Sequence, residues 1–368
     1  MQKEFTIGLK LLDNTFYESM TDKKKHHYIP RFYLKKFSVN NEGKLIGLYN
    51  HNKNVFVQNA QLKHQAYENF LYGEDDEIEN ALAEIENNIA RMFYYWTEEK
   101  LLYPPPIESN GFKLLKRFIL YQTFRTPKSG NDIMETLNQG LKTVIKEIMP
   151  VMWDKVKDGS FVHKKPVLLS LLHAIKYEYL LNYLDCKFIV NLSPLPLITS
   201  DSPVILYNQL MENVGNYVGA TGLVAKGLQV FYPIHPRLMI CLYDANVYDF
   251  GNGCINCCST ESVEEVHQLN ALQFVNSKAQ LFFDENISEE YIKMLCDRYA
   301  EYRMTSKTIN SIINKGAKKF FFMSSEDARI NLSLDFFKFK VNPDDYKDEI
   351  FPLRHPSFDR PIKKINFS

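Results

Sequence analysis

The segment from His26 to Arg31 contains side chains that could transfer a proton and bind an anion. It reads His26-His27-Tyr28-Ile29-Pro30-Arg31. An imidazole gains or loses a proton near neutral pH, because its unperturbed pKa is about 6.5. A guanidinium can hold a phosphate or a carboxylate through two parallel N–H groups. Neighbouring side chains of an extended chain point to opposite sides, so we expect one histidine to face a given pocket. A solvated basic stretch that leads into the core would have the same residues.

Gln122 and Arg125 form a second candidate pair, at the end of a predicted helix. Residues three apart lie on one face of a helix, so the two side chains would point in the same direction. At a helix end they could reach a cleft and position a substrate. Arg125 has an alternative explanation, because a cation near the C-terminus of a helix interacts favourably with the helix dipole.

A third polar group is the segment Thr199-Ser200-Asp201-Ser202-Pro203, which directly follows a short apolar run. Loops at strand ends often carry functional groups, and Asp201 could orient a histidine or bind a metal. Serine and aspartate before a proline are also ordinary turn residues, which would explain the segment without a function. Asn270, on a later predicted helix, could donate its amide to a site or lie on the helix surface.

The cysteines do not complete a metal site. Cys254, Cys257 and Cys258 form a C-x-x-C-C cluster, but tetrahedral zinc needs four ligands and no second pair has ligand spacing. Only His235 or His267 could complete the set. We name no metal ligand, and no cofactor follows from the residues.

The elements that would position these groups change in type along the chain. Periodic apolar residues predict helices at 76–97, 109–125, 132–152, 167–184, 263–276 and 289–302. Short apolar runs predict strands at 187–191, 197–199, 204–207, 228–232, 238–243, 318–323 and 332–341, and a hairpin from 44–49 and 54–58. Residues 215–227 mark a glycine-rich loop without the Gly-Lys-Ser/Thr of a phosphate-binding P-loop. Glu79 and Glu86 could share a face of the first long helix, although a solvated helix surface explains them more simply.

This order of elements predicts an α+β fold, in which a helical N-terminal half with a short β-hairpin packs on a mixed β-sheet in the C-terminal half. The 368 residues suffice for two domains. We place a mainly helical lobe at 1–185 and a sheet-rich lobe at 186–368. One integrated domain is the alternative.

The composition limits the classes of partner. The 44 Lys+Arg balance 44 Asp+Glu, which excludes a surface that binds nucleic acid or anionic membrane everywhere but leaves room for a basic patch. The 45% hydrophobic content excludes a mainly disordered chain. No signal peptide is evident, and no apolar run approaches the roughly 18 residues of a membrane span. We expect a cytoplasmic protein with reduced cysteines and no membrane partner.

Taken together, the motifs resemble a bacterial family known as domain of unknown function 4238. The pattern of that family comprises an HHYxPRFYL segment, a helix ending in QxxRTP, a TSDxPV turn, an FPxxP segment and a helix carrying LN. Here these are residues 26–34, 122–127, 199–204, 231–236 and 269–270, and the resemblance spans about 25–283. His235 departs from the small residue that is usual at its position. The family name carries no function, so the resemblance implies which residues matter, and it favours His27 over His26.

The main hypothesis is a phosphodiesterase-type hydrolase that acts on RNA, a ribonuclease-like effector of a bacterial stress response such as defence against phage. His27 would be the general acid or base, held by Asp201, and Arg31 and Arg125 would bind the phosphate and stabilise the charge of the transition state. The other substrate-binding residues would be His26, Gln122, Ser200 and Asn270. Lysines at 23–25 with aromatic neighbours would add a basic, base-stacking surface.

Two other hypotheses use the same residues. In the first, the cluster belongs to a non-catalytic module that binds a nucleotide, RNA or a protein, because arginines and amides bind anions without any chemistry. In the second, the cluster is a buried hydrogen-bonded network that stabilises the fold. A homodimer is a further expectation.

Overall fold

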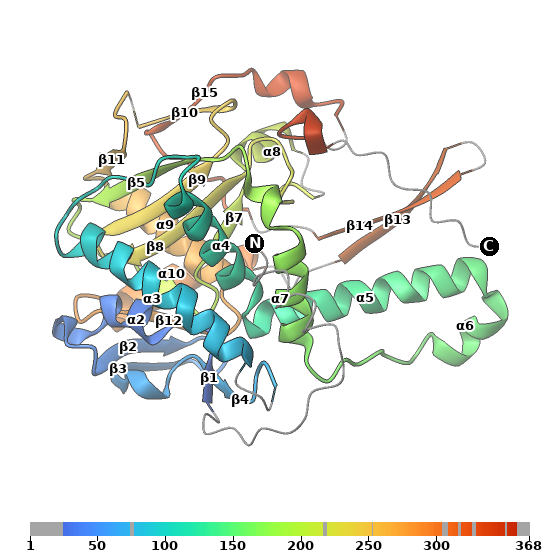
Figure 1. Ribbon diagram of the computed structural model, residues 1–368, viewed down its shortest axis with the longest axis horizontal. Helices are drawn as coiled ribbons and strands as arrows, with labels where there is room; N and C mark the ends of the chain where they lie inside the picture. Colours follow the sequence, from blue (N-terminus) through green and yellow to red (C-terminus); the bar gives the residue numbers. More distant parts are fainter. Residues whose placement is uncertain are drawn as a thin grey trace.

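The computed structural model describes residues 25–358 except 74–76, 216–218, 252, 304–307, 316–317, 326–328 and 350–351. A five-stranded mixed sheet lies at the centre of the main body (Figure 1). Its strand order is β11 (Cys257–Thr260), β5 (Asp185–Asn191), β9 (Leu238–Tyr243), β8 (Gln229–His235) and β7 (Ile205–Tyr207). The β11–β5 pair is parallel and the other pairs are antiparallel.

Both faces of this sheet are buried, which explains why its strands are almost continuously apolar. Along β9, Ile240 belongs to the hydrophobic cluster on one face, and Met239 and Cys241 belong to the cluster on the other. The first cluster includes residues of α3 (Glu77–Thr97), α4 (Asn110–Phe124) and α7 (Pro166–Lys176). The second includes residues of α8 (Gln209–Val214), α9 (Val263–Asn276) and α10 (Glu289–Tyr299). The division into lobes at 185/186 stays a prediction.

A second sheet joins the predicted hairpin to the late part of the chain. Its order is β3 (Val55–Gln61), β2 (Leu45–Asn50), β12 (Gln280–Phe283) and β6 (Thr199–Ser200), with antiparallel pairing throughout. The hairpin expected from residues 44–58 is therefore confirmed, and its inner strand pairs with β12. The sheet brings the Thr199–Ser200 strand, next to Asp201, beside the strand that follows α9.

Small two-stranded sheets complete the β structure. β1 (Lys25–His27) pairs with β4 (Tyr67–Asn69), and β10 (Tyr248–Phe250) pairs with β15 (Phe337–Phe339), both antiparallel. The four-residue helix α2 (Arg31–Leu34) begins after Pro30, and 3₁₀ turns connect other elements. They span Lys35–Phe37, Val39–Asn41, Leu62–His64, Glu178–Leu181, Ala300–Tyr302, Pro343–Tyr346 and Pro356–Phe358.

Serine caps start the helices that border the candidate residues. The Ser109 side chain accepts a hydrogen bond from the backbone N–H of Phe112 at the start of α4. Ser262 and Ser288 cap α9 and α10 in the same way. Such caps satisfy N–H groups that the first turn of a helix leaves free. The predicted helices at 76–97, 109–125, 263–276 and 289–302 are confirmed to within a few residues.

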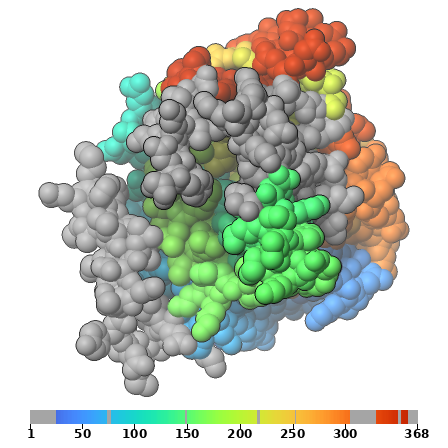
Figure 2. All heavy atoms as spheres, turned by 90° about the vertical axis from the view of Figure 1, so that its right-hand side faces the viewer, coloured from blue at the N-terminus to red at the C-terminus, as the bar shows by residue number. Residues whose placement is uncertain are grey.

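The helix predicted at 132–152 differs from the structure at both ends. α5 (Pro127–Ile148) begins five residues earlier, because Thr126 caps it and Pro127 occupies its first turn, where a proline costs no hydrogen bond. A separate helix, α6 (Pro150–Val156), begins at the next proline. α5 and α6 extend from the main body as an arm, and Figure 2 shows this green part of the chain toward the viewer.

The hairpin of β13 (Thr308–Lys315) and β14 (Lys318–Ser325) contacts α5 and lies along it in Figure 1. The strand predicted at 318–323 is thus present, and its partner β13 was not predicted. Two other predictions were too long: the helix expected at 167–184 ends at Lys176, and only Phe337–Phe339 of 332–341 is a strand. The α+β class is confirmed, with helices mainly in the first half and mixed sheets in the second.

Candidate functional site

The two adjacent histidines of β1 point to opposite sides of the strand. His26 is fully buried, stacks on the Tyr72 ring at 5.5 Å, and its Nδ1 accepts a hydrogen bond from the Tyr72 backbone N–H at 3.3 Å. His27 is half-buried on the other side, with its ring 5.7 Å from that of Tyr67. His26 is therefore part of the core, and His27 is the histidine that solvent or a ligand can approach.

His27 is held in its neutral form. Burial lowers its pKa to about 4, and the positive charges of Arg31 and Arg125 act in the same direction, against the backbone carbonyls of Gln65 and Ala66. Its Nδ1 atom is buried and has no hydrogen-bond partner in the part of the chain that the structure describes. At neutral pH the ring is therefore uncharged, and the two neighbouring guanidinium groups disfavour its protonation unless negative charge is brought beside it.

Gln122 and Arg125 meet the N-terminal segment at one backbone carbonyl. The Tyr28 carbonyl accepts hydrogen bonds from Gln122 Nε2 at 2.9 Å and from Arg125 Nε at 3.0 Å. Arg125 Nε also donates to Gln122 Oε1 at 2.9 Å. Both side chains are buried, and α4 ends at this point because Arg125 is its C-cap. They therefore fasten the segment after His27 to the end of α4.

The partner that balances the buried charge of Arg125 is Glu86 on α3. Its Oε1 atom lies 2.7 Å from Arg125 Nη1, and this carboxylate side chain is 23% exposed. Burial lowers the pKa of Arg125, but the Glu86 carboxylate, together with Tyr72 and Tyr232, more than offsets this, so the net shift is upward. The expectation that Glu86 lies on a solvated helix surface is therefore wrong. The helix spacing alone did not reveal the ion pair, because the partner is 39 residues away.

Three buried polar atoms around Arg125 lack a hydrogen-bond partner among the described residues. They are Nη2 of Arg125 itself, Nδ1 of His27 and the hydroxyl of Tyr232. The Arg125 charge lowers the pKa of His27 and opposes the rise that burial imposes on the pKa of Tyr232, so one guanidinium acts on both side chains. An unpaired buried polar group costs about 1–3 kcal/mol. Tyr232 was not predicted as a site residue, because an aromatic residue inside an apolar strand reads as core.

Asp201 binds backbone and not the histidine. Its Oδ1 accepts from Lys278 N at 2.7 Å, and its Oδ2 accepts from Ala279 N at 2.7 Å and Gln280 N at 2.9 Å. Burial raises the pKa of Asp201 to about 6, while these N–H groups act to lower it. Within the described residues there is no hydrogen bond between Asp201 and His27. The expected support of His27 by Asp201 is thus not what the structure contains; Asp201 closes the turn between α9 and β12.

Ser200 and Asn270 also make structural contacts. Ser200 Oγ donates to Gln273 Oε1 at 2.8 Å. Asn270 Oδ1 accepts from Ile198 N at 2.9 Å, and its Nδ2 donates to the Pro196 carbonyl and to the Tyr291 hydroxyl, each at 2.9 Å. Both side chains are fully buried. They attach α9 to β6 and to the segment just before it, so Asn270 is not an ordinary helix-surface residue.

Arg31 is the exposed cation of the cluster. It is the first residue of α2 and one of the two arginines whose charge lowers the pKa of His27. Of the predicted basic run, Lys23 and Lys24 lie outside the described residues, and Lys25 places its ammonium 4.7 Å from the centre of the Tyr67 ring. Lys25, His27 and Arg31 therefore give this side of the N-terminal segment a positive, partly aromatic surface.

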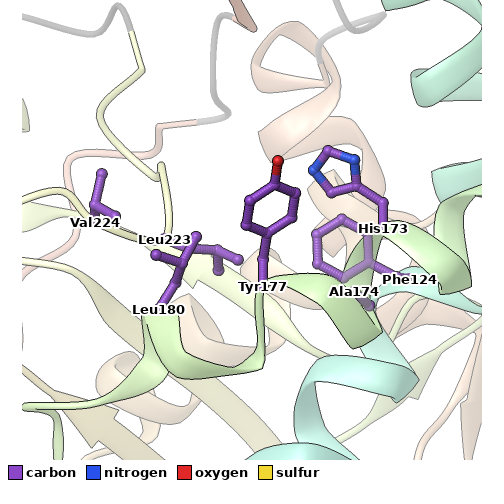
Figure 3. A pocket seen from close by; sticks show the side chains of 7 residues that line it. All are labelled: Phe124, His173, Ala174, Tyr177, Leu180, Leu223 and Val224. Carbon is purple, nitrogen blue, oxygen red and sulfur yellow. The ribbon is translucent and has the colours of Figure 1, made fainter. Parts of the chain in front are cut away.

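A separate apolar cavity of about 370 Å³ lies where α4, α7 and the glycine-rich segment meet (Figure 3). Its lining is made of Phe124, His173, Ala174, Tyr177, Leu180, Leu223 and Val224. The rings of His173 and Tyr177 lie 4.5 Å apart on one side of it. No sequence motif predicted this cavity, because its walls come from three segments that are distant in the chain.

Neither a metal site nor a membrane span is found in the described part of the chain. No three histidine, cysteine, aspartate or glutamate side chains are grouped to hold a metal ion there, so neither His235 nor His267 completes the cysteine cluster. Among the described helices, none combines the length and apolar character needed to cross a bilayer.

Comparison with known proteins places the chain in a family but gives no activity. The family model described as "Protein of unknown function (DUF4238)" matches residues 25–286, which contain all the candidate residues above. No curated protein and no solved structure matches the chain. The agreement of the motifs from His26 to Asn270 with a model covering most of the sequence leads to one conclusion: this chain belongs to the DUF4238 family.

Proposed function

We propose that His27, Arg31 and Arg125 form a binding site for a phosphate group of RNA or of a nucleotide, and that the protein hydrolyses a phosphodiester there. The observation that carries this proposal is a set of three buried polar atoms without a hydrogen-bond partner among the described residues: Arg125 Nη2, His27 Nδ1 and the Tyr232 hydroxyl. The Arg125 charge acts on the other two side chains. Two of these groups are donors, and a phosphate oxygen is the acceptor that suits them best. His27 and Glu86 are each partly exposed.

The electrostatics of His27 suit a base that is activated by its own substrate. Without an anion nearby, burial and two arginines keep the ring neutral. A bound phosphodiester would place negative charge beside the ring and raise its pKa, which favours proton transfer from a ribose 2′-hydroxyl. The 2′-oxygen would then attack phosphorus as the 5′-oxygen leaves, and Arg31 and Arg125 would stabilise the added charge. The leaving 5′-oxygen would take the proton from His27, and the other product would be a 2′,3′-cyclic phosphate. Water, giving a proton to His27, would then attack this phosphate, and the 2′-oxygen would leave with that proton, which completes the hydrolysis.

Asp201, Gln122, Ser200 and Asn270 have a different role in this proposal than the sequence suggested. Their hydrogen bonds go to backbone or to neighbouring core side chains, so we assign them to holding the segments that carry the site. His26 likewise positions β1 against Tyr72. The chemistry therefore rests on fewer residues, with His27 in the central position.

The second candidate function is binding without turnover. It is favoured by the absence of a carboxylate hydrogen-bonded to His27 among the described residues, because a catalytic histidine is often oriented by such a partner. In that case His27, Arg31 and Arg125 would recognise a nucleotide, RNA or an anionic segment of a protein. One assay separates the two candidates.

The assay follows a 5′-labelled single-stranded RNA oligonucleotide with purified protein, measuring both bound fraction and chain cleavage. The wild type is compared with His27→Gln and Arg31→Ala, and with His64→Gln and Arg298→Ala as matched exposed controls. Hydrolysis predicts cleavage that is lost in His27→Gln and unchanged in the controls. Binding by wild type without cleavage supports the second candidate. Equal behaviour of all five proteins would refute the site.

The cellular role and the homodimer also remain proposals. A role in bacterial defence against phage predicts that cells expressing wild type survive infection better than cells expressing His27→Gln.

For a homodimer, the arm offers exposed apolar side chains: Leu137, Leu141, Val144, Met149 and Val151. Light scattering after gel filtration, with Leu141→Glu as the variant, tests whether these side chains associate.

A further inference from the structure

Two cysteines outside the proposed site lie with their sulfur atoms in contact. Cys254 is exposed in the turn after β10, and Cys257 is the first residue of β11, the edge strand that pairs with β5. Their Sγ atoms are 3.8 Å apart. Ile255, between them, is 83% exposed, so the turn stands at the surface where a small molecule can reach it.

The surroundings of the pair make the two sulfurs unequal. Backbone N–H groups of Cys257 and Asn256 act on the Cys254 sulfur, and together with the Cys257 thiol and the Lys187 ammonium they lower the pKa of Cys254. Burial raises the pKa of Cys257, and its contact with Cys254 raises it further. The exposed Cys254 sulfur therefore loses its proton more readily than the less exposed Cys257 sulfur. A thiolate is the reactive form of cysteine.

Lys187 holds the turn in place. Its ammonium donates to the backbone carbonyls of Phe250 at 2.5 Å and Cys254 at 2.7 Å. Gly251 and Gly253 adopt φ values of 88° and 87°, a region that residues with a side chain rarely enter. A Cβ built on Gly253 would meet no atom within 4 Å, so there is free space beside the turn. The sulfurs must approach to about 2 Å to bond, and a short surface turn can allow that movement.

We propose that Cys254 and Cys257 are a peroxide-reactive pair, in which Cys254 is the attacking thiolate and Cys257 the resolving thiol. The Cys254 sulfur attacks one oxygen of a hydroperoxide and the O–O bond breaks, which leaves a sulfenic acid on Cys254 and releases an alcohol or water. The Cys257 sulfur then attacks the Cys254 sulfur, a disulfide forms, and a second water leaves. In total two thiols are oxidised by two electrons and the peroxide is reduced by two.

The other cysteines do not compete for this reaction. Cys258 follows Cys257 on β11 but points to the opposite face, into the second hydrophobic cluster, and Cys241 and Cys296 are also buried. Burial raises the pKa of Cys186, Cys241, Cys258 and Cys296, so all four stay protonated. Zinc is a poorer reading of the pair, because no third ligand is near it within the described residues.

The test treats the folded, reduced full-length protein with a slight excess of hydrogen peroxide, blocks free thiols with N-ethylmaleimide and measures the mass of the protein and of its peptides. Wild type is expected to lose two alkylatable thiols, to show a peptide linked from Cys254 to Cys257, and to recover both thiols with dithiothreitol. Cys257→Ser should stop at a sulfenic acid on Cys254 that dimedone traps. Cys254→Ser should show neither product, and Cys296→Ser should behave as wild type.

Two results would overturn the proposal. One is a wild-type protein whose Cys254 and Cys257 both remain alkylatable under peroxide that oxidises another cysteine. The other is a Cys254→Ser protein in which Cys257 oxidises at the wild-type rate, because Cys254 would then not be the attacking group. Circular dichroism of each variant confirms that it is folded before either result is counted.

Discussion

The Arg125 guanidinium and the Tyr28 carbonyl are joined by a hydrogen bond of 3.0 Å across 97 residues of chain. This contact fastens the segment that carries His27 to the C-terminal end of α4. Glu86 on α3 balances the positive charge of Arg125. A buried arginine with a buried ion pair is costly to keep unless its donors are satisfied. Here Nε and Nη1 are satisfied, and Nη2 has no hydrogen-bond partner among the described residues; in the proposed function this is the donor that meets the phosphate.

Replacing Arg125 should therefore cost stability well beyond that of a surface arginine. In Arg125→Gln the Glu86 carboxylate loses its cation and the Tyr28 carbonyl loses one of its two donors, and we expect the free energy of unfolding to fall by about 3 kcal/mol. Arg298→Gln is the matched control, because it removes an exposed pair with Glu264 that is worth at most about 1 kcal/mol. Urea denaturation followed by circular dichroism measures both. Equal losses in the two variants would contradict the structural role given to Arg125.

Asp201→Asn tests the role of Asp201 in closing the turn between α9 and β12. The two carboxylate oxygens accept three backbone N–H groups, and an amide offers one oxygen, so its NH₂ would face a donor. We expect a loss of about 1–3 kcal/mol in the free energy of unfolding, with RNA binding per folded molecule unchanged. Asp154→Asn, whose side chain is 82% exposed, is the control. A fully stable Asp201→Asn protein that no longer binds or cleaves RNA would instead return Asp201 to the chemistry.

The helices and sheet strands were largely predictable because their signals are local. Val263–Asn276 and Leu238–Tyr243 have the predicted bounds, since a serine cap and a continuous apolar run each mark their ends in the sequence. The errors fall where one residue has two roles. Pro127 ends α4 and also begins α5, so treating it only as a helix breaker shortened the next helix.

The site was harder to predict, because its geometry depends on contacts between distant segments. Gln122 and Arg125 do share a helix face, as their spacing indicates, but their common target is a backbone carbonyl that has no signature in the sequence. A carboxylate such as Asp201 reads the same way whether it binds a histidine or three N–H groups. Glu86 and Tyr232 looked like helix surface and core strand until the fold placed both near Arg125.

The pH dependence of stability should report the neutral state of His27. Its pKa in the folded protein is about 4, below the ordinary value of 6.5, so the unfolded chain binds the proton more tightly. The contribution of His27 to stability is therefore fully present above pH 6.5 and is lost as the pH falls toward 4. His27→Gln lacks this group, so the stability difference between wild type and variant should change across that window and be constant above it.

Other groups titrate in the same range, and the difference between the two proteins removes most of their effect. Thermal unfolding of wild type and His27→Gln at half-unit steps from pH 4 to pH 8 gives the comparison. Parallel curves for wild type and His27→Gln would mean that His27 has an ordinary pKa. The affinity for RNA should rise as the pH falls, because a bound anion raises the pKa of His27. This rise in affinity should be smaller in His27→Gln.

The hydroxyl groups of the stacked tyrosines Tyr33 and Tyr232 differ in their hydrogen bonding. Their rings are 5.1 Å apart, yet the Tyr33 hydroxyl bonds to Thr199 at 2.6 Å and to the Pro233 carbonyl at 2.7 Å, and the Tyr232 hydroxyl has no partner among the described residues. Tyr33→Phe should lower the free energy of unfolding by about 1 kcal/mol or more, because the Thr199 and Pro233 groups lose their partner. Tyr232→Phe removes a hydroxyl that has no hydrogen-bond partner among the described residues, so the stability of the variant should equal or exceed that of wild type.

The affinity for labelled RNA should follow the opposite order. If the Tyr232 hydroxyl and Arg125 Nη2 donate to a bound phosphate, Tyr232→Phe weakens binding by about tenfold, the value of one hydrogen bond to a charged group at about 1.5 kcal/mol. Tyr33→Phe should bind as wild type once corrected for the folded fraction. Fluorescence anisotropy with the same oligonucleotide measures both. Unchanged affinity in Tyr232→Phe, together with a loss of stability like that of Tyr33→Phe, would show that its hydroxyl serves only the fold and that the phosphate lies elsewhere.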